Sequence, residues 1–99
     1  MAKTLKYKDP LSRQLKDHKK AAAYLNKALQ ESDLRAFLLA LRHVAEAQGG
    51  MSKLAEKSEL NRENLYRTLS RKGNPRFFNL LAVLKTFDLK LTIIAKSKT

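Results

Sequence analysis

The 99-residue chain contains no cysteine, and this absence excludes disulfide bridges, thiol nucleophiles and zinc sites built on cysteine. No apolar stretch approaches the roughly 20 residues that a transmembrane helix needs. The residues that follow Met1 do not lead into the apolar region of a signal peptide. We therefore expect a soluble, cytoplasmic protein without a membrane partner.

Acidic residues are also scarce, with 9 Asp and Glu against 21 Lys and Arg, so the formal net charge is +12. Residues 1–20 carry seven cations and two anions, residues 21–50 three of each, and residues 51–76 seven cations and three anions. A neutral middle thus separates two basic regions. The balance favours a polyanionic partner such as nucleic acid or a membrane surface. A solvated lysine-rich surface is the alternative explanation.

The length and the hydrophobic content of 43% are sufficient for one compact domain. Residues 1–17 show little periodicity, although Asp9-Pro10 suggests a turn or a helix start. We divide the chain into a basic N-terminal segment, residues 1–17, and a domain over residues 18–99. No internal repeat or low-complexity run interrupts that domain.

Apolar residues at helical spacing predict two longer helices in the first half of the chain. The first begins near Lys19, with Ala22, Leu25 and Leu29 on its inner face. Asp33 is expected to cap the second helix, because its carboxylate can accept the unpaired amides of the next turn. The predicted inner face of that helix comprises Leu34, Phe37, Leu38, Leu41, Val44 and Ala45. Gly49 and Gly50 end it.

Three further helices are predicted in the second half. Ser52 is expected to cap a short helix that ends near Ser58, and Asn61 to cap a helix over residues 62–71. Leu65 and Leu69 lie four residues apart and face inward. Gly73 suits the left-handed position after that helix, and Asn74-Pro75 is typical of an N-cap followed by the first helical residue. The last helix has an inner stripe of Phe77, Leu80, Leu81, Leu84 and Phe87.

The alternating pattern of residues 89–93 predicts a short C-terminal strand. A single strand cannot satisfy its own backbone amides and carbonyls. We therefore expect a two-fold homodimer built partly on residues 89–95. Pairing with residues 4–7 of the same chain is the alternative.

The helix over residues 62–71 leaves a polar face uncovered. At about 100° per residue, Glu63, Arg67, Ser70 and Arg71 point away from the inner leucines. Arginine, asparagine and glutamate are residue types that contact base edges, and arginine also binds phosphates. An ordinary solvated helix face, with Glu63 paired to Arg67, is the alternative. His18 and His43 are isolated, and no catalytic or metal-binding set is found, so we expect neither enzyme activity nor a cofactor.

The segment from Leu54-Ala55-Glu56-Lys57 through Leu60-Asn61-Arg62 to Gly73-Asn74-Pro75 resembles the Cro/cI (XRE)-type helix-turn-helix. Over roughly residues 9–95 the chain is more closely similar to HigA-like addiction module antidote proteins. The similarity lies in Ala23-Tyr24-Leu25, Phe37-Leu38, the run from Leu65 to Ser70, and Asn74-Pro75. One departure is Glu59, because the family usually has glycine in the turn between the two helices.

The resemblance implies an all-α, lambda-repressor-like helix-turn-helix bundle of about five helices with a short C-terminal β-strand. It also implies an antitoxin of a type II toxin-antitoxin module that represses its own operon and neutralises a RelE/HigB-like toxin. Two copies of the helix over residues 62–71 would bind a palindrome in double-stranded DNA at successive major grooves. The expected DNA contacts are Ser52, Lys53, Asn61, Arg62, Glu63, Asn64, Tyr66, Arg67, Arg71 and Lys72.

Three alternatives stay open. A phage- or plasmid-type repressor would lack the toxin partner but share the DNA-binding features. A small basic ribonuclease toxin would share the length and charge, but needs several strands around a basic cleft. A structural RNA-binding protein would bind without sequence preference. For toxin contact, the sequence indicates only the basic N-terminal segment or the first helix.

Overall fold

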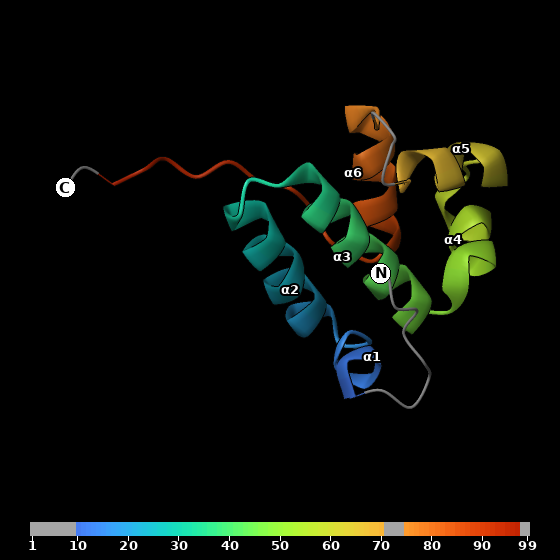
Figure 1. The fold of residues 1–99 in the computed structure, drawn as a ribbon, viewed down its shortest axis with the longest axis horizontal. Helices are drawn as coiled ribbons and strands as arrows, with labels where there is room; N and C mark the ends of the chain where they lie inside the picture. The colour runs from blue at the N-terminus through green and yellow to red at the C-terminus, as the bar shows by residue number, and fades with distance from the viewer. Residues whose placement is uncertain (1–9, 71–74, 98–99) are drawn as a thin grey trace.

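Six α-helices form the regular secondary structure of residues 10–70 and 75–97, the parts of the chain that the computed structural model describes (Figure 1). They are α1 (Pro10–Gln14), α2 (His18–Gln30), α3 (Leu34–Ala47), α4 (Gly50–Ser58), α5 (Arg62–Thr68) and α6 (Phe77–Thr86). The prediction of about five helices did not count α1, which lies in the segment without clear periodicity and begins at Pro10, where the sequence suggested a turn or a helix start. None of the helices in these residues is long and apolar enough to cross a membrane.

Helix starts follow short polar side chains at three positions. Asp33 Oδ1 accepts hydrogen bonds from the amides of Arg35 (2.9 Å) and Ala36 (3.4 Å), which confirms the predicted cap of α3. Asn61 Oδ1 accepts from the amide of Asn64 at 2.7 Å, which confirms the cap of α5. Asp17 caps α2 in the same way, through the amide of Lys20 at 3.2 Å.

Two predicted helix starts are wrong. Ser52 does not cap α4, because that helix already begins at Gly50, after Gly49 at φ 120°. This backbone geometry is costly for other residues, and it lets α3 turn directly into α4. Pro75 is not the first residue of α6, because Arg76 has an extended backbone (ψ 135°) and serves as the N-cap. The predicted cap at Asn74 lies outside the described residues.

The hydrophobic core centres on α3, against which α1, α2 and α4 pack, and α4 in turn contacts α5 and α6. The largest fully buried side chains are Leu15, Leu38, Leu41, Val44, Leu65, Leu69 and Val83. The predicted inner face of α3 is buried except for Leu34. On α2 the prediction of Ala22, Leu25 and Leu29 is confirmed only for Leu25, because the buried residues are Ala21, Leu25 and Ala28, while Ala22 is partly buried and Leu29 is exposed. Both exposed leucines lie beside the turn that joins α2 to α3.

The segment after α6 differs from the prediction of a strand. Residues 89–97 form no strand with any other described residue, and Ile93 is 96% exposed. A lone strand leaves its backbone amides and carbonyls unpaired, and the described chain offers no second strand with which residues 89–97 could pair. In Figure 1 the segment leaves the bundle on the side away from α5. The alternative partner, residues 4–7, lies outside the described residues.

The N-terminal segment contributes to this bundle from residue 10 onward. Leu15 is fully buried, and its carbonyl accepts a hydrogen bond from Gln48 Nε2 at 3.2 Å. The end of α1 is thereby joined to the end of α3. The division of the chain after residue 17 stays a prediction.

Three helices end at non-glycine residues in the left-handed region: Ser32 after α2, Glu59 after α4 and Asp88 after α6. Glu59 has φ 64° and ψ 11°, so the predicted departure from glycine in this turn is accommodated by a left-handed glutamate. Such a conformation costs an L-residue about 1–2 kcal/mol. The turn between α4 and α5 therefore has the left-handed backbone that glycine adopts easily, and the strain is confined to the backbone of Glu59.

Glu59→Gly is expected to raise the free energy of unfolding by about 0.5–1 kcal/mol, because relief of the left-handed cost exceeds the added entropy of glycine in the unfolded chain. Urea denaturation measures the change. Glu56→Gly is the matched control, since it removes the same side chain from the interior of α4, and it should destabilise by about 1 kcal/mol. A loss of stability in both variants would contradict the assignment of strain to Glu59.

A partly buried polar pair joins α2 to α3. The hydroxyl oxygen of Tyr24 and Nδ1 of His43 are 2.7 Å apart. Burial lowers the pKa of His43, and Arg42 lowers it further while Glu46 raises it; burial also raises the pKa of Tyr24. The fold therefore favours neutral His43.

Because the pKa of His43 is lower in the folded than in the unfolded chain, its contribution to stability is complete above the unfolded pKa of about 6.5. That contribution is lost as the pH falls through 6.5 towards the folded pKa. We expect the free energy of unfolding, measured in urea between about pH 8 and pH 5.5, to fall more steeply for the natural chain than for His43→Gln. Equal slopes would contradict the prediction.

Candidate nucleic-acid interface

The candidate interface is built on α4, the turn of residues 59–61 and α5. Leu54 of α4 and Leu65 of α5 are buried in the core, and Leu69 continues the buried side just after α5. Leu60 in the turn is partly buried against the same core. The inner side of α5 is thereby held in place, and its outer side is left to solvent.

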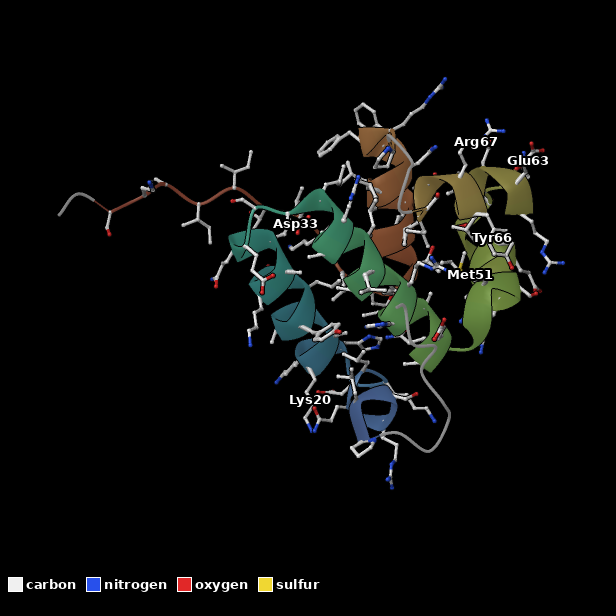
Figure 2. All side chains as sticks on the ribbon, in the orientation of Figure 1. Lys20, Asp33, Met51, Glu63, Tyr66 and Arg67 are labelled. Atoms are coloured by element: carbon white, nitrogen blue, oxygen red, sulfur yellow. The ribbon has the colours of Figure 1, made fainter. Side chains whose placement is uncertain are left out.

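The outer side of α5 is polar and cationic. Eight of the predicted contact residues, which belong to α4, to the N-cap of α5 and to α5 itself, are exposed. They are Ser52, Lys53, Asn61, Arg62, Glu63, Asn64, Tyr66 and Arg67. Figure 2 shows Glu63 and Arg67 projecting away from the bundle, with Tyr66 on another side of α5. Hydrogen bonds join the side chains of Ser52 and Arg62, the side chain of Asn61 and the amide of Asn64, and the side chains of Glu63 and Arg67, whereas Lys53 lines a different hollow with residues of α3 and of the end of α6. Arg71 and Lys72 lie outside the described residues.

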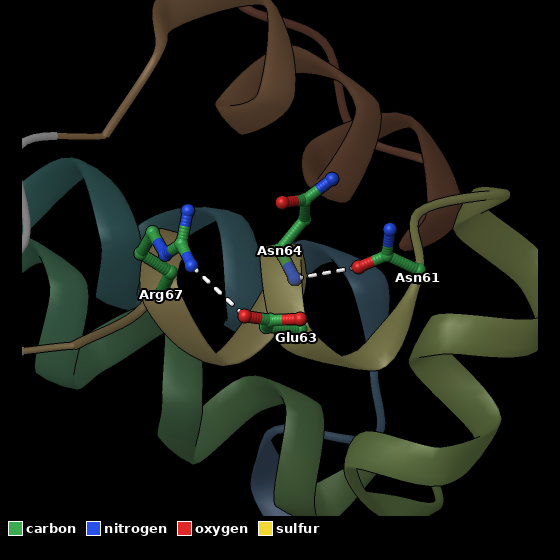
Figure 3. A network of polar contacts seen from close by, with 4 residues as sticks. All are labelled: Asn61, Glu63, Asn64 and Arg67. Carbon is green, nitrogen blue, oxygen red and sulfur yellow. Dashed lines mark hydrogen bonds and ion pairs between the residues drawn. The ribbon is translucent and has the colours of Figure 1, made fainter.

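Two exposed contacts organise this surface. Arg67 Nη2 lies 3.0 Å from Glu63 Oε1, one helical turn away (Figure 3). Arg62 Nη2 donates to the hydroxyl oxygen of Ser52 at 3.2 Å and so links α5 to α4. The side chains of Arg67 and Glu63 are 70% and 81% exposed. An exposed pair of this kind contributes only about 0.3–0.5 kcal/mol, so another acceptor can replace Glu63 at low cost.

A polar hollow between α5 and the start of α6 extends the surface. It is lined by Asn64, Arg67, Thr68, Pro75, Arg76 and Asn79. Arg76 and Asn79 were not among the predicted contact residues. The available signal was the cluster of cations over residues 51–76, of which Arg76 is the last. Two guanidinium groups and two side-chain amides around one hollow can hydrogen-bond an anion such as a phosphate.

Other polar groups of the described chain do not form a metal centre. No group of three or more histidine, aspartate or glutamate side chains in residues 10–70 and 75–97 is arranged to hold a metal ion. His18 Nε2 and Asp88 Oδ2 are 3.5 Å apart, but both side chains are exposed. Nδ1 of His43 already contacts the hydroxyl oxygen of Tyr24.

Comparisons with known proteins identify the family of this chain. Residues 5–95 match the family described as probable addiction module antidote protein, and the chain belongs to that family. An antidote of this kind implies a toxin as its partner. An uncharacterized protein of Haemophilus influenzae is 39% identical over 70 residues, which cover 71% of each chain. No solved structure matches the chain.

Proposed function

We propose that this antidote protein is a DNA-binding antitoxin of a type II toxin-antitoxin module that represses its own operon. The observation that carries the proposal is the exposed face of α5, with Arg62, Asn64 and Arg67 held outward by the buried Leu65. In this proposal α4 and α5 form a HigA-like, Cro/cI (XRE)-type helix-turn-helix. The chain supplies binding surfaces and no catalytic step.

In the proposed complex, α5 enters the major groove of double-stranded DNA. Arg67 and Asn64 contact base edges, because guanidinium and amide groups match the donor and acceptor patterns of guanine and adenine. Lys53, Arg71 and Lys72 contact the phosphate backbone and set the register of the protein on the duplex. A homodimer presents two such helices to an operator palindrome.

The proposed toxin partner is a RelE/HigB-like protein. Membership of the antidote family supports a toxin partner in general, and the sequence resemblance to HigA-like proteins supports this toxin class. The described residues contain helices and no strand, which favours the antitoxin over a strand-rich ribonuclease toxin. A repressor without a toxin would share the DNA contacts proposed for α5.

Binding to the protein's own upstream DNA and to a random duplex, measured across a salt series, tests the DNA part of the proposal. We expect a preference of about a thousandfold or more for the upstream DNA. Both affinities should fall with salt, because phosphate contacts release counterions. Equal and steeply salt-dependent binding to both duplexes would contradict specific autorepression.

Binding of the purified chain to the product of the neighbouring gene tests the toxin part separately. A stable complex that suppresses the activity of a RelE/HigB-like neighbour is the expected result. Specific DNA binding without such a complex would favour the repressor that lacks a toxin.

A further inference from the structure

The chain that follows α6 runs outward from the bundle and is largely exposed (Figure 1). The amide of Leu89 donates a hydrogen bond to the carbonyl of Leu84 at 2.9 Å. Beyond Leu89, no backbone hydrogen bond joins residues 90–97 to another described residue. Ile93 and Ile94 are 96% and 81% exposed, so almost nothing in the described chain covers them. We call residues 90–97 the exposed segment.

The side chains of the exposed segment favour a strand that is covered on both faces. Thr92, Ile93 and Ile94 are three consecutive β-branched residues, the type that packs best on a pleated sheet. In a strand, successive side chains point to opposite faces, so Leu91 and Ile93 share one face and Ile94 lies on the other. Apolar residues on both faces are typical of a strand buried on both sides. The segment therefore lacks both a backbone partner and a cover for its two faces.

The base of the exposed segment is fixed to the bundle. Leu89 packs against the hydrophobic core. Leu91 lines an apolar hollow with Leu29 of α2 and Phe37 of α3, and Leu91 and Leu29 are each 42% exposed. The segment thus begins at a defined position, and apolar surface of the bundle continues beside it. Since it leaves on the side away from α5 (Figure 1), a partner bound there would leave the polar face of α5 accessible.

We propose that the exposed segment binds the toxin by adding an edge strand to the toxin's β-sheet. The proposal rests on the proposed function, which assigns a strand-rich, RelE/HigB-like toxin to this antidote. The edge strand of an open sheet carries a row of unpaired amides and carbonyls, and an added strand satisfies them together with its own. The isoleucine side chains then supply apolar contact on the two faces of the sheet.

A second copy of this chain is a less suitable partner for the same segment. Two exposed segments paired with each other would form a two-stranded ribbon, which has little stability by itself in water. Because Ile93 and Ile94 lie beyond the cover of their own bundle, such a ribbon would leave apolar faces in solvent. A toxin sheet with a packed core can extend its apolar layers over the added strand. Strand addition to the toxin therefore competes with the homodimer that the sequence predicted on residues 89–95.

Binding of the purified product of the neighbouring gene, measured by calorimetry with the full chain, tests the side chains. We expect Ile93→Ser and Ile94→Ser each to raise the Kd at least about 10-fold, as for residues central to an interface. Phe78→Ser is the matched control, because Phe78 is apolar and 78% exposed but lies on α6. It should leave this Kd nearly unchanged. Circular dichroism verifies that all three variants keep the helical fold.

Amide hydrogen exchange, followed by NMR on the natural chain, tests the backbone. The amides of residues 91–96 should exchange rapidly in the chain alone, since no described group accepts their hydrogen bonds. In the toxin complex we expect protection at every second residue, because an added edge strand directs alternate amides at its neighbour. Protection that already exists without the toxin would overturn the proposal. If such protection rises with chain concentration, it assigns the pairing to a second copy, and otherwise to the same chain.

The inference and the proposed function fail in different measurements. If the natural chain and both isoleucine variants bind the neighbouring product equally, the toxin partner stands and strand addition is wrong. If the natural chain does not bind that product, the toxin part of the proposed function fails, and strand addition fails with it. Equal binding to upstream and random DNA would overturn only the DNA part of the proposed function.

Discussion

Leu65→Ala is expected to lower the free energy of unfolding by about 2–5 kcal/mol, the range for truncating a large side chain in a packed core. Leu65 is fully buried and anchors α5 to the bundle. Small domains have a total stability of about 5–15 kcal/mol, so this variant should unfold at much lower urea concentrations. Urea denaturation followed by circular dichroism gives the value.

Lys57→Ala is the control for Leu65→Ala, because Lys57 lies on the exposed side of α4. Its effect should stay within about 0.5 kcal/mol. The same titrations can be repeated with DNA present. A Leu65→Ala protein of natural stability would show that this side chain does not hold α5 against the bundle.

Arg67→Ala is expected to reduce discrimination between upstream and random DNA by about 1–3 kcal/mol, the contribution of a good base contact. The physical reason is the loss of a bidentate donor on the outer side of α5, whose present partner Glu63 is exposed and weakly bound. Affinities for the two duplexes, measured at one salt concentration, give the change in discrimination.

Lys72→Ala provides the contrast, since a phosphate contact weakens binding to all DNA about equally and lowers the salt slope by about 1. Glu63→Ala controls for the ion pair, because it removes the partner of Arg67 and keeps the guanidinium group. If Arg67→Ala and Lys72→Ala weaken both duplexes equally, the division between base and phosphate contacts is wrong.

The helices of this chain were predictable where periodicity and capping residues agree. Asp33 and Asn61 precede amphipathic runs, and both cap helices in the structure. The predicted cap at Ser52 was wrong, because Gly49 and Gly50 precede it and already allow the helix to begin. A helix can begin after a side-chain cap or after a glycine with positive φ, and the sequence of residues 49–52 is compatible with both.

The misassigned parts of the fold depend on contacts between distant segments. The spacing of Phe77 relative to Leu84 suggested an inner position, but the start of α6 extends beyond the side chains that bury its later turns. The alternation in residues 89–93 has the period of a strand, yet a strand also requires a partner. The hollow that adds Arg76 and Asn79 forms only when α6 packs beside α5.

The hydrogen bond between Arg67 and Glu63 also has a thermodynamic consequence for recognition. Immobilising a long side chain on binding costs about 0.5–1.5 kcal/mol, and Glu63 already restricts the guanidinium group in the free protein. This restriction is weak, since both side chains are largely exposed. In the proposed DNA complex it lowers the entropic cost of fixing Arg67, so we expect calorimetry to show a somewhat larger entropic penalty for Glu63→Ala than for the natural chain. Under the proposed function, Glu63 would hold the guanidinium group near its binding position until a DNA acceptor replaces the carboxylate.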